Sequence, residues 1–377
     1  MWASAIRHGW VVDGDVPGPE VDEFADPGEV IEALAGSDGE SLLAVQHPHR
    51  TPAALARNLT LPQALPQARR TLDRLLANAY RPVRDVVAVY EVAGPDGTAI
   101  GVLCLIDPAA IDAHVWHSEE VYPRIVADRA AALTGLGRAT SAALLVPVAD
   151  GEDLTAIASA AVEGREPDVR TADAGGRAHR LWLLEDHEDL LRQVRRHRLL
   201  VADGNHRVAA ASRANAQLLA LVTSGPDLRI GAIHRVLTGT GLTTADLAAA
   251  WRGVGLPVHE RPDPPAPDKP GLVTVPSGLV VELPATAEPL PRIDHGLVER
   301  LLIAEALGID PEGPHVRALP EGHVPGGDVD AVLRLAPVPL ADVLAVHDQG
   351  RRMPRKSTYF TPKPHSGLLI ANISGEF

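Results

Sequence analysis

The segment Leu199–Leu218 constrains the fold most, because an apolar strand-like run stops there and a helical segment starts at once. The apolar run is Leu199–Ala202, the interruption is Asp203-Gly204-Asn205, and the alanine-rich segment His206–Leu218 follows. Gly204 allows the backbone to bend sharply and to approach a ligand closely. A strand that leads directly into a helix is typical of proteins with a sheet and flanking helices.

Other segments predict the same class of fold. Val86–Val92 and Ile100–Ile106 are β-branched apolar runs joined by a turn with Asp-Gly, which predicts a hairpin. Leu42–Val45 also has the composition of a short strand, whereas Glu119–Leu133 and Asp186–Arg196 have helical patterns. Hairpins mixed with strand–helix alternation indicate an α/β fold with a mixed sheet and flanking helices.

The clearest linker candidate is the proline-rich segment Pro257–Gly271, whose composition suits neither helix nor strand. It predicts two parts: a mixed α/β core over residues 1–242, and a smaller α+β part over residues 243–377. The basic C-terminal segment is expected to fold back on the core, with Tyr359-Phe360 as its anchor.

Charge and hydropathy narrow the class of partner. The chain has 35 Lys+Arg and 49 Asp+Glu, a net charge of −14, which disfavours nucleic acid as a partner but still allows one small phosphate in a local basic pocket. No apolar run approaches the ~18 residues that would cross a membrane, and the N-terminus lacks a secretory signal. A cytoplasmic protein without a membrane partner is expected. Its oligomeric state stays open.

The Asp203–Arg207 turn is the strongest candidate site. The first N–H groups of a helix have no partner within the helix and lie at its positive end, where they favour an anion. His206 and Arg207 sit in this first turn, where cations are unfavourable unless an anion neutralises them. Gly204, Asn205 and Arg207 are therefore candidate phosphate ligands, and Arg207 is expected to face solvent. The alternative is an Asp-capped helix with two solvated side chains.

Two further basic clusters are candidates for the same ligand. His234-Arg235 follows an apolar stretch, and a solvated strand end is an equal interpretation. The C-terminal segment Met353–Lys363 is extended and bracketed by prolines. Four of its basic and hydroxyl side chains could lie along a phosphate: Lys356, Ser357, Thr358 and Lys363. The alternative is that the segment is a mobile basic tail.

A candidate general base lies at His117-Ser118-Glu119-Glu120, where a carboxylate adjoins an imidazole. The alternative is an acidic first turn that complements a helix dipole. The sequence contains no Walker A loop, no Gly-x-Gly-x-x-Gly, no His-Glu-x-x-His and no Gly-x-Ser-x-Gly, and no histidine pair has convincing metal-ligand spacing. A protein-bound metal is therefore not predicted.

Over nearly its whole length the chain resembles the family catalogued as domain of unknown function 1015. The landmarks that carry the resemblance occur in the family's order: Tyr90-Glu91, His117–Glu120, Asp128-Arg129, His179–Trp182, Ala202–Arg207, His234-Arg235, Met353–Lys363 and Ser366–Leu368. Asn205 replaces the first histidine of the family's Asp-Gly-His-His-Arg turn. The family's N-terminal Pro-Pro-Tyr-Asp motif is not recognisable, and Pro17–Asp22 occupies about that place.

The turn also resembles the phosphate-binding box of the ParB and sulfiredoxin superfamily, which includes free serine kinases. This resemblance implies a ParB/sulfiredoxin-like core and a kinase of a small metabolite, such as free serine, with ATP or ADP, or alternatively CTP, and Mg²⁺. Asp203, His206, His117 and Glu119 or Glu120 would then be the catalytic candidates. A nucleotide-binding regulator and a hydrolase of a phosphorylated metabolite are the alternatives.

Overall fold

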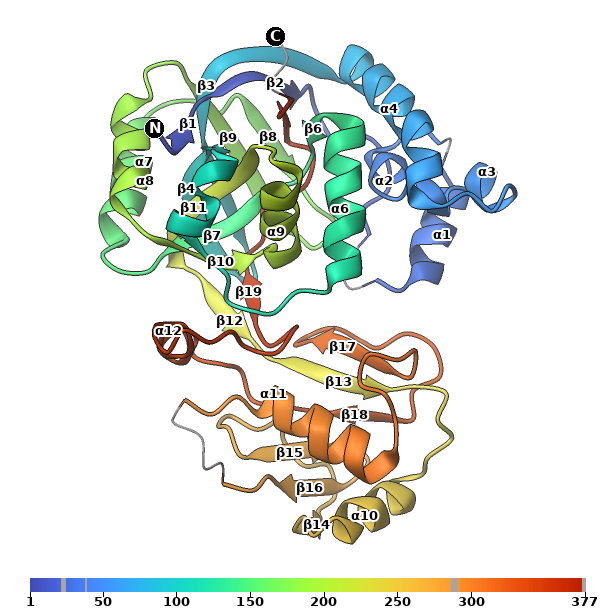
Figure 1. Ribbon diagram of the computed structural model, residues 1–377. Helices are drawn as coiled ribbons and strands as arrows, with labels where there is room; N and C mark the ends of the chain where they lie inside the picture. Colours follow the sequence, from blue (N-terminus) through green and yellow to red (C-terminus); the bar gives the residue numbers. More distant parts are fainter. Residues whose placement is uncertain (22–24, 38, 286–290, 375–377) are drawn as a thin grey trace. The chain divides into compact units, whose positions relative to one another are not determined.

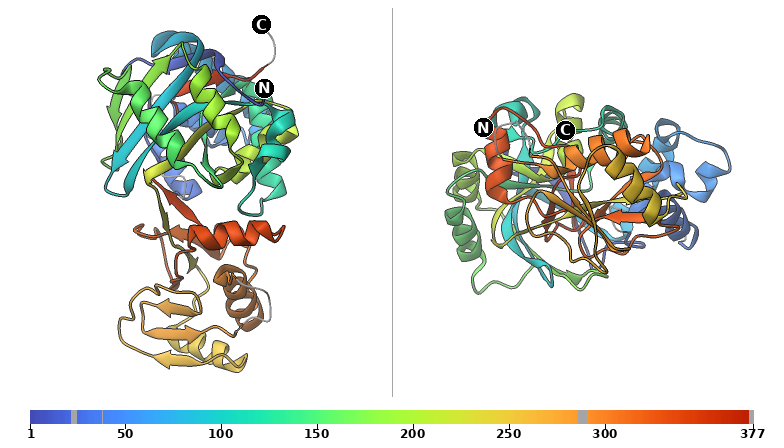
Figure 2. Two further views of the ribbon diagram at one scale, coloured as in Figure 1. Left: turned by 90° about the vertical axis from the view of Figure 1, so that its left-hand side faces the viewer. Right: turned by 90° about the horizontal axis from the view of Figure 1, so that it is seen from below.

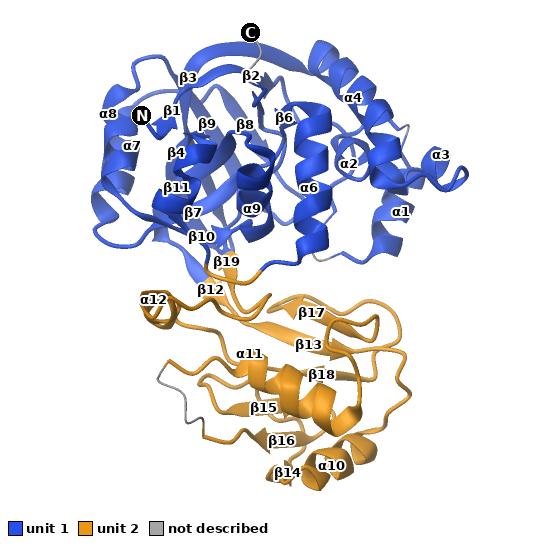
Figure 3. Ribbon diagram, in the orientation of Figure 1, with its two compact units in different colours: residues 1–117, 121–229, 361–377 blue, residues 118–120, 230–360 orange. Residues whose placement is uncertain are grey.

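The computed structural model describes residues 1–21, 25–37, 39–285 and 291–374 (Figure 1). Asp22, the last residue of the segment that replaces the N-terminal motif, lies outside them. The chain divides into two compact units (Figure 3): unit 1 comprises residues 1–117, 121–229 and 361–377, and unit 2 comprises residues 118–120 and 230–360. The predicted boundary at residue 242 therefore falls inside unit 2, and so does the proline-rich segment.

Unit 1 contains a 12-stranded mixed sheet, which confirms the predicted α/β class. Its main path is β5-β10-β7-β11-β4-β3-β2-β20-β6; β1 pairs with β4, β9 with β3, and β8 with β9. The strands are β1 (Ala3–Ser4), β2 (Ile6–Val12), β3 (Tyr80–Gly94), β4 (Gly97–Ile106), β5 (Val115–Trp116), β6 (Arg138–Ala139), β7 (Ala143–Pro147), β8 (Val169–Ala172), β9 (Ala178–Leu184), β10 (Leu199–Asp203), β11 (Leu218–Asp227) and β20 (Leu369–Asn372).

The predicted hairpin is confirmed as β3 and β4, the long curved strands in Figures 1 and 2. Gly97, at φ +131°, supplies the left-handed backbone at the turn, where a Cβ would meet the carbonyl of Asp227 at 2.3 Å. β3 lies between β4 and β9, with Tyr90 opposite Gly101 on one side and Leu181 on the other. This register places Tyr90 in the middle of the sheet.

Unit 1 also contains helices, several of which bury apolar side chains against the sheet. They are α1 (Pro27–Ala35), α2 (Leu42–Gln46), α3 (Pro52–Leu55), α4 (Leu61–Asn78), α5 (Ile111–His114), α6 (Pro123–Leu136), α7 (Glu152–Val162), α8 (Glu188–Arg196) and α9 (Asn205–Ala214), with 3₁₀ turns η1 (Pro48–Arg50) and η2 (Pro108–Ala110). Leu154 of α7, Leu191 of α8 and Val208 of α9 belong to the main core. α9 packs against α6 and contacts β7, β10 and β11.

The predicted strand at Leu42–Val45 is wrong, because the segment is helix α2. The Ser41 hydroxyl accepts a hydrogen bond from the backbone N–H of Ala44 at 3.1 Å and caps the helix start. All four residues of the predicted strand are buried. A short, fully buried apolar run has no period that would distinguish helix from strand.

Unit 2 has its own core. Its elements are β13 (Ile233–Leu237), α10 (Thr244–Gly253), β14 (Val258–Glu260), β15 (Leu272–Val275), β16 (Leu279–Glu282), α11 (Asp294–Leu297) continued as a π-helix over Val298–Glu305, β17 (Val316–Pro320), β18 (Ala331–Leu333) and α12 (Leu340–Asp348). β12 (Arg229–Gly231) and β19 (Tyr359–Thr361) contain two of the four points at which the chain passes between units. Trp251 is fully buried and donates to the carbonyl of Leu302.

The unit boundary follows from strand pairing. β13 pairs on one side with β17 and on the other with β18, which both lie far along the chain. Sequence composition does not reveal such long-range pairing. In the described part of the chain no helix is long and apolar enough to cross a membrane.

Candidate phosphate-binding site

The turn has the local structure that the sequence predicted. β10 ends at Asp203, Gly204 has φ +98°, and α9 begins at Asn205. The N-cap residue is Gly204, which has no side chain that could cap this helix start. The first-turn N–H groups of α9 lie at the positive end of a ten-residue helix.

Arg207 folds back over the turn. Its guanidinium forms an ion pair with Asp203 and donates to the backbone carbonyl of Ala142, just before β7. A Cβ on Gly204 would stand 2.9 Å from Arg207 Nε and 3.3 Å from Cβ of Ala143. Glycine is therefore needed both for the positive φ and for the space that Arg207 occupies. The expected solvent-facing Arg207 is corrected, because its side chain is 20% exposed.

Lys363 reaches the same turn from the C-terminal segment. Its Nζ lies 2.9 Å from Asp203 Oδ1, across 160 residues of sequence. Both residues belong to unit 1. The Asp203 carboxylate thus contacts two cations, Arg207 and Lys363, and holds both of them at the start of α9.

Three more side chains surround the first turn of α9. His117 Nδ1 and the Asn205 amide oxygen are 3.1 Å apart, so this nitrogen of His117 carries the proton. His206 Nε2 accepts from the backbone N–H of Tyr122 at 3.0 Å, and the two rings stack. The structure therefore brings the predicted His117, Asn205 and His206 together at the turn.

Sequence reasoning missed a second group of basic side chains beside this turn, namely His47, Arg50 and Arg129. Gln46, the residue before His47, donates to Ser141 Oγ at 3.1 Å, and Ser141 precedes the carbonyl that Arg207 binds. Burial, followed by the charges of Arg50 and Arg129, lowers the pKa of His47 to about 4. The run His47-Pro48-His49-Arg50 has three basic residues in four positions of an acidic chain. This run is the signal that could have indicated the group.

Arg129 connects this group to the turn. It lies on α6, which packs against α9, and it is within electrostatic reach of both Arg207 and Asp203. Among the described residues neither Arg50 nor Arg129 has an ion-pair partner within 4.0 Å. Arg207 and Lys363 thus contact the carboxylate of Asp203, and Arg129 lies within electrostatic reach of it.

In unit 2, Glu119 lies in a ring of donors. Its carboxylate accepts from the backbone N–H groups of Lys356, Ser357 and Thr358, each at 2.9 Å, and from the Thr358 hydroxyl at 2.9 Å. Lys356 has φ +54°, and such a backbone turn points successive N–H groups at one anion. The predicted Lys-Ser-Thr segment is therefore an anion-binding nest that holds Glu119, whereas Glu120 is exposed.

Arg235 and His234 support this segment from β13. Arg235 is 2% exposed, pairs with Glu299 at 2.7 Å, and donates to the carbonyls of Arg355 and Lys356, each at 3.1 Å. His234 Nδ1 accepts from the backbone N–H of Leu335, and burial lowers the pKa of His234 to about 4. Both residues bind protein groups here, and their predicted contact with phosphate stays a prediction.

The predicted site residues thus divide between the units. Those in unit 1 are His117, Asp203, Gly204, Asn205, His206, Arg207 and Lys363; those in unit 2 are Glu119, Glu120, His234, Arg235, Lys356, Ser357 and Thr358. Among the described residues no group of three or more His, Cys, Asp or Glu side chains could hold a metal ion.

Fold and turn together define a mixed α/β protein whose sheet presents a strand–turn–helix junction rich in cations. The chain belongs to the family described as "Protein of unknown function (DUF1015)", which it matches over residues 28–254, and the family resemblance is confirmed. A comparison with curated proteins found no match.

Several solved structures are similar to the chain. A conserved hypothetical protein from Pyrococcus furiosus is 12% identical, with 71% of this chain and 95% of that chain covered and a TM-score of 0.41. A free serine kinase in complex with AMP is 14% identical, with coverages of 71% and 92% and a TM-score of 0.40. SbnI with a C-terminal truncation, from Staphylococcus aureus, is 15% identical, with coverages of 73% and 84% and a TM-score of 0.39.

Proposed function

We propose that the protein is a nucleotide-dependent phosphotransferase that acts on a small hydroxyl-bearing metabolite, with free serine as the first candidate. One observation carries the proposal: Arg207 and Lys363 both contact a single carboxylate, Asp203, at a helix N-terminus, and Arg129 lies within electrostatic reach of it. Cations that repel one another gather in this way when a further anion offsets the repulsion. The chain as a whole has a net charge of −14, so the gathering is local.

The anion that best fits these groups is a phosphate chain. Guanidinium groups bind phosphate oxygens in pairs, a lysine adds a point charge, and the helix start adds backbone N–H groups. The resemblance of the turn to the ParB and sulfiredoxin phosphate-binding box supports a nucleotide, with ATP or ADP first and CTP as the alternative. Mg²⁺ would accompany the phosphates, because it is commonly held by substrate phosphates and water.

Phosphoryl transfer depends mostly on positioning and on charge neutralisation, which this turn is suited to provide. The acceptor hydroxyl oxygen forms a bond to the terminal phosphorus while the bond from phosphorus to the leaving phosphate oxygen breaks. The hydroxyl proton must pass to a base. Glu119 is bound by four donor groups, so His117 and His206, which belong to the same unit as the turn, are the base candidates to test first.

The test is phosphorus NMR of the pure protein with Mg²⁺, one nucleotide at a time and a pool of hydroxyl metabolites. The expected result is a new phosphomonoester signal that grows as the nucleotide loses its terminal phosphate, and that is lost in Lys363→Ala. Nucleotide binding without turnover would indicate a regulator instead. Inorganic phosphate released from a phosphorylated metabolite would indicate a hydrolase.

A further inference from the structure

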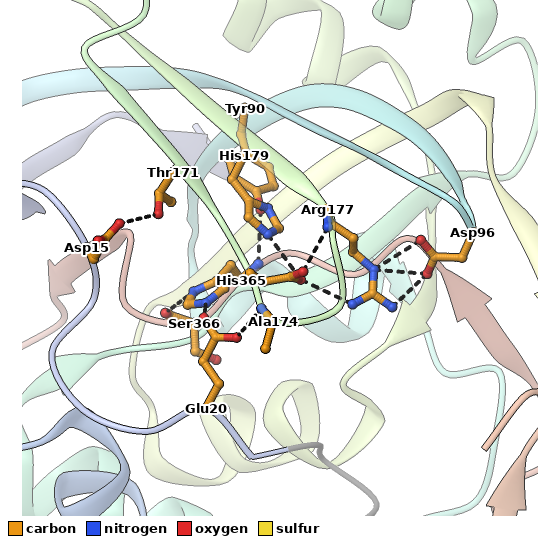
Figure 4. Close-up of polar contacts among 11 residues, drawn as sticks. Asp15, Glu20, Tyr90, Asp96, Thr171, Ala174, Arg177, His179, His365 and Ser366 are labelled. Carbon is orange, nitrogen blue, oxygen red and sulfur yellow. Dashed lines mark hydrogen bonds and ion pairs between the residues drawn. The ribbon is translucent and has the colours of Figure 1, made fainter. Parts of the chain in front are cut away.

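A polar network in unit 1 lies around the segment that carries Lys363. The segment is held at both ends. The Thr361 hydroxyl donates to the carbonyl of Asp96 at 3.0 Å, and the backbone N–H of His365 donates to the Tyr90 hydroxyl at 3.0 Å (Figure 4). Lys363 is midway between these two anchors. Its Nζ position at Asp203 therefore depends on where the anchors are held.

The two anchors are themselves connected through buried polar groups. Asp96 binds the Arg177 guanidinium at 2.8 Å, and Arg177 binds Asp173 at 3.1 Å. Asp173 lies 3.2 Å from His179 Nε2, and His179 Nδ1 lies 2.7 Å from the Tyr90 hydroxyl. Together with the segment itself these contacts form a closed ring.

Protonation states follow from the same contacts. Burial raises the pKa of the Tyr90 phenol, which therefore keeps its proton for His179 Nδ1. Burial, followed by the charge of His365, lowers the pKa of His179, whose Nε2 lies 3.2 Å from Asp173 Oδ2. Tyr90 accepts from His365 and donates to His179, so its hydroxyl is fully used within the ring.

His365 adds a second tie, to the segment that replaces the family's N-terminal motif. Its Nε2 lies 2.7 Å from Glu20 Oε1, and its Nδ1 lies 2.7 Å from the carbonyl of Ser366. Both partners are hydrogen-bond acceptors, so His365 connects Glu20 to the segment that carries Lys363. Glu20 Oε2 in turn accepts from the backbone N–H of Ala174 at 2.9 Å, beside Asp173.

We propose that this network positions Lys363 at the turn, with Tyr90, His365 and Glu20 as positioning residues for the anion that Lys363 binds. The inference rests on the proposed function for the identity of that anion. It also deepens that function, because it assigns a role to Glu20, at a place where the chain departs from its family's pattern.

Lysine labelling tests the positioning without any nucleotide. The chain has three lysines, Lys269, Lys356 and Lys363. Lys269 is exposed, whereas the Lys363 side chain is 20% exposed and forms an ion pair with Asp203. The rate of reductive methylation of each lysine can be measured by mass spectrometry. The ratio of the Lys363 rate to the Lys269 rate then reports how firmly Lys363 is held. Asp203→Asn, which removes the partner of Lys363, sets the upper limit of that ratio.

The expected result is that Tyr90→Phe and Glu20→Gln each raise the Lys363-to-Lys269 ratio by about threefold to tenfold, in line with the loss of a hydrogen bond. Glu91→Gln is the matched control. Glu91 lies beside Tyr90 on β3, and the substitution removes its ion pair with Arg180, which does not involve the segment that carries Lys363. Ratios unchanged in both variants would overturn the inference. If Tyr90→Phe unfolds, Glu20→Gln decides, since Glu20 is 40% exposed and outside the core.

A double-mutant cycle adds a readout that general destabilisation would not move. Tyr90→Phe should weaken ADP binding in calorimetry, and it should cause no further loss in a Lys363→Ala background. Equal losses in both backgrounds would show that Tyr90 acts independently of Lys363 and would overturn the inference. If the parent protein binds no ADP while the labelling ratios change as expected, the proposed function fails and the positioning network stands.

Discussion

Replacing Gly204 with alanine should destabilise the protein far more than the loss of one glycine normally does. Two costs are expected to add. A non-glycine residue at φ +98° costs about 1–2 kcal/mol in backbone strain. The new Cβ would stand 2.9 Å from Arg207 Nε and 3.1 Å from its Cζ, so the guanidinium must leave its place.

Displacing Arg207 disrupts its charged hydrogen bonds to Asp203 and to the carbonyl of Ala142. Loss of a hydrogen bond to a charged group costs about 1.5–3 kcal/mol, and both partners are partly buried here, at 20% and 14% side-chain exposure. The total for Gly204→Ala is therefore roughly 2.5–5 kcal/mol. Urea denaturation followed by circular dichroism measures it.

Gly14 offers a matched control, because it has φ +104° and no heavy atom within 4 Å of its hypothetical Cβ. Gly14→Ala should cost only the backbone strain of about 1–2 kcal/mol. In an Arg207→Ala background, the cost of Gly204→Ala should fall toward the same value, since no guanidinium has to move and only the 3.3 Å approach to Cβ of Ala143 remains. Equal costs for Gly204→Ala and Gly14→Ala in the parent protein would refute the proposed packing of Arg207 over the turn.

Three further outcomes are expected. Arg207→Ala should lower the free energy of unfolding by about 1.5–3 kcal/mol and weaken ADP binding, whereas Arg213→Ala, at the exposed end of α9, should change neither. Burial lowers the pKa of His295 to about 3, below its unfolded value near 6.5, so stability should fall as the pH drops from 6.5 toward 3. The loss at pH 5 is roughly 2 kcal/mol, and a His295→Gln variant with an unchanged pH slope would contradict it. Glu119→Gln should lower the urea midpoint because an amide cannot satisfy the nest, whereas the same change at the exposed Glu120 should leave it in place.

Local signals were sufficient to predict the turn and the hairpin. The end of the apolar run and the start of the helix both depend on residues adjacent in sequence, so each could be predicted to within one residue, at Ala202 for Asp203 and at His206 for Asn205. The predicted end of the helix at Leu218 is wrong, because α9 ends at Ala214. Lys363 could be predicted to lie near the turn, because a lysine joins other cations only where a shared anion offsets their repulsion. Leu42–Val45 could not be assigned, because its burial removes the period by which helix and strand differ.

Features that depend on distant segments could not be predicted. The Arg207 guanidinium donates to the carbonyl of Ala142, which lies just before β7. No pattern in the sequence around Arg207 indicates this contact. Tyr90, His179 and His365 come from two strands and the C-terminal segment, and only the sheet register brings them together. The Glu119 nest likewise joins residues more than 230 positions apart.

Calorimetric titration of the parent protein with ADP and with adenosine, in the presence of Mg²⁺, tests the central claim most directly. If the Asp203–Arg207 turn binds phosphate, ADP should bind and adenosine should bind at least about tenfold more weakly, since each charged contact contributes about 1.5–3 kcal/mol. Lys363→Ala should bring the affinity for ADP toward that for adenosine. Equal binding of the two ligands, or ADP binding that does not change in Lys363→Ala, would contradict the assignment of a phosphate site to this turn.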